Sequence, residues 1–207
     1  SSREEVEDRF DALAAQVGPE DFSYLTFHRE RFCETLLRCL PLLQDHLRLL
    51  VVGDWLCFLN VLIEEFCETE VSHCFDRNEA RIGFRLSRNE EAWYNRIGVD
   101  LEREPWPAER ESYDLVISTE VIEHFASDPM HFLCEANRIL NPGGQILTST
   151  PNGSYLLSIY HAIHGDSPVS FGVFSDPLIE HPKEYSVNEL ALMHAQAGFA
   201  VAHHETF

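Results

Sequence analysis

The chain has 207 residues, of which 44% are hydrophobic and 24% charged, as is typical of one globular domain with a substantial core. Its formal charge of −20 argues against a general role on nucleic acid or on a membrane surface, because phosphate backbones and lipid headgroups are also negative. No apolar run reaches the roughly 18–20 residues that span a bilayer. The first residues lack the leader pattern of a secreted protein, so we expect a single cytoplasmic domain over residues 1–207.

The six cysteines contain no CxxC pair and lie mostly in apolar segments. This usage indicates buried, reduced thiols, which suits a cytoplasmic protein. Cys67, His73 and Cys74 stand close enough in the sequence to suggest metal ligands, but their spacing matches no common zinc pattern.

Two amphipathic helices are predicted before any strand, over residues 3–17 and 23–40. In the first, Val6, Phe10 and Leu13 recur at helical spacing, and Pro41 ends the second. We expect these helices to form a cap over residues 1–46, next to whatever site the domain carries.

From residue 47 onwards the pattern alternates between strands and helices. Apolar or alternating runs predict strands over 47–53, 70–75, 94–101, 114–118, 145–150 and 199–202, and helical spacing predicts helices over 56–66, 129–140 and 187–197. Such alternation predicts an α/β fold, a doubly wound and mostly parallel sheet with helices on both faces. Ligands of such sheets bind beyond the carboxyl ends of the strands.

The predicted core spans residues 47–152, and residues 187–207 hold the last helix and strand. Between them, residues 153–186 are rich in Gly, Ser, Pro and aromatic residues. We expect that inserted segment to lie over the site like a lid.

Four segments resemble the class I S-adenosylmethionine (SAM) methyltransferase family, whose fold is Rossmann-like. They are GVDLEREPWPAERESYDLV (98–116), YDLVISTEVIEH (113–124), RILNPGGQILTSTPN (138–152) and HPKEYSVNELALMHAQAGF (181–199). The resemblance covers about residues 47–203, and its most specific part is 113–152. It implies SAM as the cofactor and methyl transfer as the reaction.

The family's glycine-rich first turn is only partly present. Gly53 matches its first glycine, and Asp54 follows, but Trp55 and Cys57 occupy the next two glycine positions. Glycines at such a turn permit positive φ and let the backbone approach the amino-acid end of the cofactor. The bulk of Trp55 implies that the cofactor binds in a shifted pose or that the pocket is filled.

The other cofactor positions that the resemblance implies are better preserved. Asp76 follows the second predicted strand, where an acid binds the ribose hydroxyls. Asp100, with Leu101, falls where the family contacts the adenine, although 98–101 can also be read as the second strand with Asp100 on the ribose. Ser118 and Thr119 end the fourth strand beside the methyl donor.

Glu120, Glu123 and His124 have the spacing that would place them on one face of a short helix. Such a set can bind a divalent cation, remove a proton from a substrate, or play a structural part near a helix N-terminus. The ExxEH pattern resembles that of ubiquinone-pathway O-methyltransferases and of small-RNA 2′-O-methyltransferases, which implies a metal held by Glu120, Glu123, His124 and His181. Under the alternative, Glu120 or His124 is the catalytic base.

The sequence thus favours a SAM-dependent methyltransferase that acts at O or N of a small-molecule substrate. A non-catalytic methyltransferase-like scaffold is the alternative, because Trp55 and Cys57 disturb the first turn. The family's usual final hairpin strand is not in this sequence: it lies beyond these residues, comes from a partner, or is absent. If the sheet edge is unpaired, we expect that a homodimer could form there.

Overall fold

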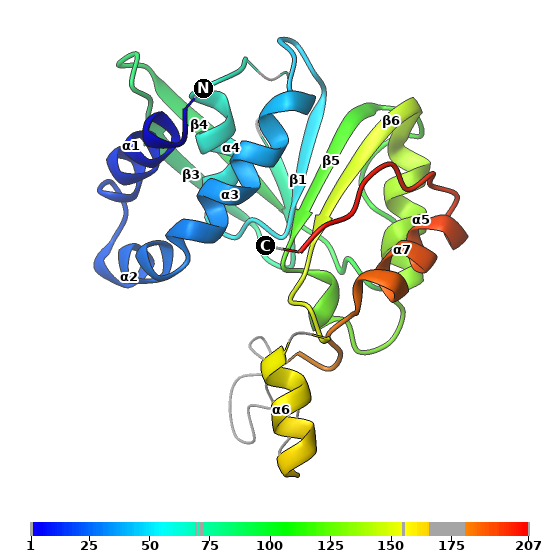
Figure 1. Cartoon of the computed structure of the whole chain (residues 1–207). Coiled ribbons are helices and arrows are strands. Elements are labelled where there is room, and N and C mark those ends of the chain that lie inside the picture. The colour runs from blue at the N-terminus through cyan, green and yellow to red at the C-terminus, as the bar shows by residue number, and fades with distance from the viewer. Residues whose placement is uncertain (1, 69, 71–72, 155, 166–180, 207) are drawn as a thin grey trace.

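The computed structural model describes residues 2–68, 70, 73–154, 156–165 and 181–206. Within these residues one sheet has the strand order β3-β4-β2-β1-β5-β6, and all neighbours are parallel except β3 and β4. The strands are β1 (Leu49–Val52), β2 (His73–Asp76), β3 (Ala80–Arg85), β4 (Glu91–Gly98), β5 (Tyr113–Thr119) and β6 (Leu140–Ser149). The expected doubly wound, mostly parallel α/β fold is confirmed (Figure 1).

Helices cover both faces of this sheet (Figure 1). One face carries α1 (Arg3–Ala14), α2 (Pro19–Phe27), α3 (Arg29–Cys39) and α4 (Phe58–Glu64), and the other carries α5 (Pro129–Ile139) and α7 (Val187–Gln196). Short 3₁₀ turns follow α3 and β5, namely η1 (Leu40–Leu42) and η2 (Ile122–His124), and α6 (Leu156–His164) projects away from the body. Buried side chains form one apolar cluster on each side of the sheet.

The N-terminal helices are part of the core rather than an appendage. The ring centroid of Phe58 on α4 lies 5.0 Å from that of Phe10 on α1 and 5.5 Å from that of Phe32 on α3. Aromatic rings at such distances stabilise the fold by more than the burial of their surface alone. The Gln16 side chain also joins α1 to the edge strand, because it donates to and accepts from the backbone of Arg85.

The β2–β4 connection differs from the expected pattern. The sequence predicted a strand ending at Asp76 and another around residues 94–101, and both are present as β2 and β4, which pair in parallel. Between them the structure adds β3, which pairs antiparallel with β4 at the sheet edge. Because β2 lies between β1 and β4, β2 is the second parallel strand, and it ends at Asp76. Residues 98–101 therefore end or follow the third parallel strand, β4, and are not the second strand.

Three expected elements need correction. The single helix predicted over 23–40 is two helices, α2 and α3, which meet at His28. The strand predicted over 145–150 is β6, which begins earlier, at Leu140. Its pairing with β5 is irregular between Tyr113 and Leu115, and Gly143 has a positive φ in this part of β6. The predicted strand at 199–202 is wrong, because residues 199–206 have no regular structure.

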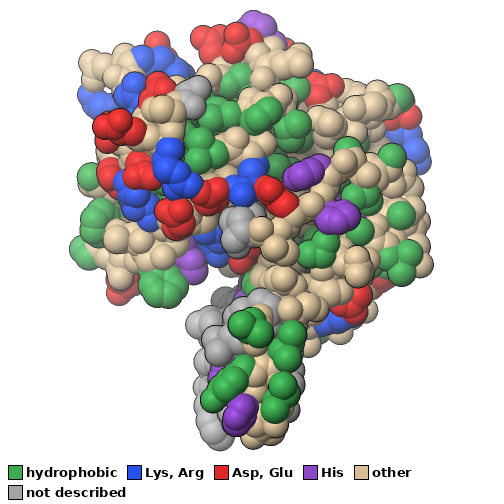
Figure 2. Space-filling model, viewed as in Figure 1, with side chains coloured by type: hydrophobic (Ala, Val, Ile, Leu, Met, Phe, Trp, Pro, Cys, Tyr) green, Lys and Arg blue, Asp and Glu red, His purple; other side chains and the backbone are tan. Residues whose placement is uncertain are grey.

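The surface is patterned unevenly. Acidic and basic side chains alternate over the N-terminal helices, whereas apolar side chains gather on the projecting α6 (Figure 2). There Leu156 and Ile163 are 82% and 76% exposed. Residues 166–180 of the inserted segment lie outside the described residues, so the segment's expected role as a lid stays a prediction. Among the described helices, none is long and apolar enough to cross a membrane.

Candidate active site at the carboxyl ends of the strands

The first turn, between β1 and α4, is built without the usual series of glycines. Gly53 has φ +77° and its N–H donates to Phe75 O at 2.8 Å. Cys57 also has a left-handed φ of +52°. This conformation is unfavourable for most residues other than glycine. The Asp54 carboxylate then accepts from the N–H groups of Phe58, Leu59 and Asn60 at 2.8–3.1 Å. It thereby satisfies the first turn of α4, as an N-terminal cap does.

Burial gives this turn two perturbed groups. Burial raises the pKa of Asp54 to about 6, although the backbone N–H donors at α4 lower it. Behind the turn, Cys57 Sγ lies 3.2 Å from Cys74 Sγ, and both thiols are buried. The side chain that replaces a family glycine therefore points into the protein and packs on β2.

Trp55 does not fill the crevice between the first turn and the loop after β5. Its side chain is 47% exposed, and its ring lies edge-on to Tyr24 with centroids 6.0 Å apart. Instead, Val121 packs directly against Gly53, so that a Cβ at Gly53 would overlap Val121 Cγ2. Beside this contact remains a cavity of only about 40 Å³, whose lining includes Arg31, Gly53, Asp54, Trp55, Thr119 and Glu120.

A much larger cavity, of about 740 Å³, opens at the ends of β2 and β4. Its lining includes Arg77, Gly98, Asp100, Glu102, Arg103 and His124. Asp76 is half-buried at the end of β2. Burial raises its pKa, and the nearby charges of Arg96 and Arg77 offset only part of this rise. Asp100 Oδ1 accepts from Glu102 N at 3.0 Å, and Leu101 is buried beside it.

Glu120 lies outside the 3₁₀ turn, so the expectation that it shares a helical face with Glu123 and His124 is wrong. Its φ of +56° turns the side chain toward the N-terminal helices, where Oε2 lies 3.5 Å from Arg31 Nη1. Ser149 Oγ donates to the other carboxylate oxygen at 3.0 Å. Ser118, one of the predicted cofactor residues, is buried in β5 and its hydroxyl has no hydrogen-bond partner among the described residues.

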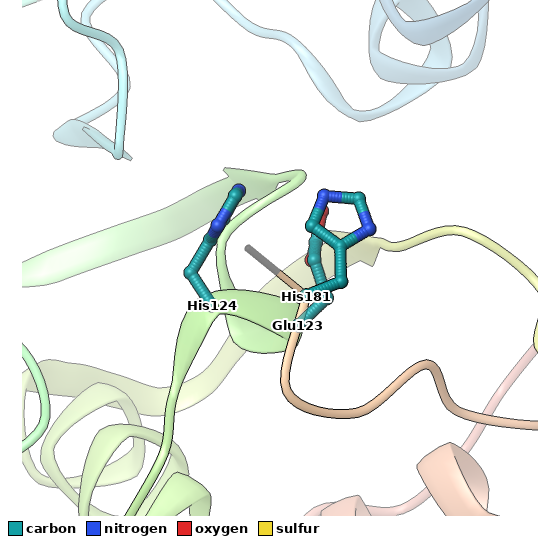
Figure 3. Close-up of side chains that lie close together, drawn as sticks. All are labelled: Glu123, His124 and His181. Atoms are coloured by element: carbon teal, nitrogen blue, oxygen red, sulfur yellow. The ribbon is translucent and has the colours of Figure 1, made fainter. Parts of the chain in front are cut away.

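Glu123, His124 and His181 converge on one point above the sheet (Figure 3). One potential ligand atom from each lies within 4.8 Å of the others, and the two imidazole rings are 4.8 Å apart at 83°. Glu123 is buried, and burial, together with the charge of Glu120, raises its pKa to about 8. Thr150 Oγ1 donates to Glu123 Oε2 at 3.0 Å, while Oε1 has no partner among the described residues.

The sequence pattern thus identified three members of this cluster, including one from a distant segment. It did not identify Arg31, Tyr24 and Val121, which lie around the first turn and its small cavity. Arg31 lies on the amphipathic helix α3, where it is one polar residue among many. No local spacing in the sequence indicates that it faces Glu120.

With this fold and site in view, comparisons with known proteins give a consistent class. A sequence profile of the methyltransferase domain matches residues 24–204. The chain therefore belongs to the methyltransferase domain family, and membership implies SAM as the methyl donor.

Individual relatives are more distant. The ubiquinone biosynthesis O-methyltransferase of Roseobacter denitrificans is 42% identical over 60 residues, 28% of this chain and about a quarter (24%) of that protein. A Haloferax volcanii methyltransferase, solved with a methyltransferase activator protein, matches with TM-score 0.60 and 18% identity over 94% of this chain and 77% of its own. A SAM-dependent methyltransferase from Thermotoga maritima gives TM-score 0.55 and 18% identity over 87% and 80%. Both structural likenesses show the fold.

Proposed function

We propose that the chain is a SAM-dependent methyltransferase that transfers a methyl group to O or N of a small-molecule acceptor. The observation that carries this proposal is the Glu123–His124–His181 cluster, which stands beside the 740 Å³ cavity at the carboxyl ends of the parallel strands. Ligands of doubly wound sheets bind at this edge. Perturbed titratable groups in such a cleft are typical of functional sites.

The residues present fit the nucleoside portion of the cofactor. A cavity of about 740 Å³ falls in the size range of small-molecule sites, and the carboxylates of Asp76 and Asp100 can accept hydrogen bonds from hydroxyl and amino groups. Gly53, Asp54 and Trp55 would border the amino-acid portion. Of the remaining predicted cofactor residues, Thr119 lines the small cavity, whereas Leu101 and Ser118 are buried and would support the site from behind.

When bound, the cofactor supplies a methyl group on a positively charged sulfur. This chain's contribution is to hold the acceptor in line with that methyl group and to exclude water. The His124 imidazole, which lines the cavity, would take the proton from the acceptor hydroxyl or amine. Glu120, the other residue expected as a base, is instead paired with Arg31. The charge of −20 would also favour approach of a cationic donor.

A divalent cation fits the same cluster, as an alternative in which His124 would be a metal ligand and not the base. Two imidazoles and a carboxylate are the ligands of many catalytic zinc sites, and the unpartnered, buried Oε1 of Glu123 is the kind of group that a cation would satisfy. The ion would be held by Glu123, His124 and His181. Glu120 could become a fourth ligand only if its ion pair with Arg31 broke. Such an ion would orient and polarise an acceptor hydroxyl.

Isothermal titration with SAM and with its demethylated product, S-adenosylhomocysteine, tests the proposal directly. We expect binding in the micromolar range and methyl transfer to one member of a panel of phenols and amines. His124→Gln should reduce turnover by about 100-fold or more and leave the affinity for the product within threefold, whereas the exposed His204→Gln should change neither. Titration with Mn²⁺ or Zn²⁺, repeated on His181→Ala, decides whether the cluster holds a cation.

The competing proposal is a non-catalytic methyltransferase-like domain. The observation that favours it is the cavity at the first turn, which at about 40 Å³ accommodates water but no amino acid in the described conformation. No heat with either ligand at millimolar concentration would support this alternative and contradict the enzyme.

The cytoplasmic location and a homodimer remain part of the proposal. Among the described strands β6 forms the edge at which the family's final hairpin would pair, and its outer backbone groups could pair in such a dimer. Light scattering across a range of protein concentrations measures the mass, and a monomer throughout would contradict the dimer.

A further inference from the structure

An ion pair lies in the wall of the small cavity beside the first turn. Arg31 Nη1 and Glu120 Oε2, 3.5 Å apart, both line this cavity together with Gly53 and Trp55. The pair joins the N-terminal helices to the loop after β5, two segments that are far apart in the sequence. Both side chains remain partly exposed, at 23% and 21%.

Each partner is held in place by contacts that do not depend on the other. The Arg31 guanidinium lies 5.4 Å from the centre of the Phe32 ring, and its Nη2 donates to Tyr24 Oη at 3.1 Å. Glu120 is directed by its left-handed backbone and by two hydrogen bonds to Ser149, one from Ser149 Oγ and one to Ser149 O. A positive and a negative group would therefore still face this cavity if the pair opened.

This arrangement of charge matches one end of the cofactor. The amino-acid end of SAM carries a carboxylate and an ammonium group at neutral pH, whereas its nucleoside end has no charge. The cavity at Gly53 presents one cation and one anion, and the wide cavity near Asp100 has the room that a nucleoside needs. The size and the charge of the two cavities thus indicate the same orientation of the cofactor, with its amino-acid end at Gly53 and its nucleoside end near Asp100.

The sequence of the first turn favours recognition of a ligand by side chains over recognition by backbone groups. Trp55 and Cys57 stand where glycines would bring backbone groups close to the ligand. The Cys57 N–H is already bonded to Asp54 O at 2.9 Å, and the N–H groups at the start of α4 are bonded to the Asp54 carboxylate. These donors are therefore not free to bind a ligand carboxylate.

We propose that Arg31 and Glu120 form the receptor for the amino-acid end of SAM, with Arg31 binding its carboxylate and Glu120 its ammonium group. The inference rests on the proposed function. Partly exposed ion pairs contribute little to stability, while charge-assisted bonds from a guanidinium to a carboxylate are strong, so the exchange of partners is favourable. Opening the pair also enlarges the cavity. Glu120 then binds the cofactor directly, which leaves His124 as the base.

Decarboxylated SAM gives a selective test, because it keeps the nucleoside, the sulfonium and the ammonium but lacks the carboxylate. Calorimetric titration would compare SAM with decarboxylated SAM on the wild type, Arg31→Gln and Glu120→Gln. We expect Arg31→Gln to weaken SAM by about 10- to 100-fold and to leave decarboxylated SAM unchanged or tighter. Glu120→Gln should weaken decarboxylated SAM by about tenfold, since only the ammonium contact is then at stake.

Arg29→Gln is the matched control, because Arg29 lies on the same helix but pairs with Asp11 on α1. It should alter neither affinity, and urea unfolding would confirm that all variants are folded. Equal weakening of both ligands by Arg31→Gln would overturn the inference, since Arg31 would then only hold the helical cap. If the wild type binds neither ligand, the proposed function fails and the inference fails with it.

Discussion

Val121 packs its Cγ2 methyl group so closely on Gly53 that no side chain fits at that glycine. Gly53 also has φ +77°, which other residues adopt only with strain. We expect Gly53→Ala to lower the free energy of unfolding by about 2–4 kcal/mol, from backbone strain and overpacking together. In the double variant with Val121→Ala the cost should fall well below the sum of the two single costs. Urea unfolding midpoints measure this.

Gly143→Ala separates the two causes. Gly143 has φ +84°, and an added Cβ there would meet nothing within 4 Å. It should therefore show only the backbone part, about 1 kcal/mol. Strictly additive costs for Gly53→Ala and Val121→Ala would show that the contact between these residues is not what excludes a side chain.

The buried Asp54 carboxyl should make stability fall as the pH rises. Its pKa is raised to about 6 in the folded protein, against an unperturbed value of about 4. Between these values the unfolded chain releases its proton while the folded protein keeps it. The stability contribution is therefore full below about pH 4 and is lost toward about pH 6, by about 3 kcal/mol.

Other carboxyl groups titrate in the same range, so the measured quantity is the difference between wild type and Asp54→Asn. This difference should change across pH 4–6.5 and stay level above it. A flat difference would mean that the three N–H donors at α4 offset the burial of the carboxylate. Asp54→Ala, which removes the cap, should be less stable than Asp54→Asn by about 1–2 kcal/mol at every pH.

Much of this site follows from local sequence. A buried apolar strand that ends in a polar residue identifies its own carboxyl end, and Asp76, Ser118 and Thr119 indeed lie at the carboxyl ends of β2 and β5. The approach of His181 to His124 follows from the family pattern. The Arg31–Glu120 pair and the Val121 contact with Gly53 depend on how distant segments pack, which no local spacing encodes. The β3–β4 hairpin was missed because its outer strand is partly exposed and its apolar alternation is weak.

Five of the six cysteines are buried and Cys134 is exposed, which predicts a simple pattern of thiol reactivity. Burial raises the pKa of Cys33 to about 11 and that of Cys39 to about 12, so few thiolates are present to react at neutral pH. With an aromatic disulfide reagent we expect one thiol to react rapidly in the folded protein and all six after unfolding. Cys134→Ser should remove the fast phase, and a second fast thiol in that variant would contradict the burial.

Trp55 and Trp93 form a natural pair for testing the role of bulk at the first turn. Both indoles are about half exposed, at 47% and 50%, but Trp55 borders the 40 Å³ cavity while Trp93 lies on β4 beneath the Arg81 guanidinium. Since Trp55 lines this cavity, we expect that removing its indole leaves more room there and that Trp55→Ala tightens the binding of S-adenosylhomocysteine several-fold. Trp93→Ala should leave the affinity unchanged and control for the loss of a half-exposed ring. Weaker binding by Trp55→Ala would mean that the indole contacts the ligand as an aromatic surface, and calorimetric titration of both variants distinguishes these outcomes.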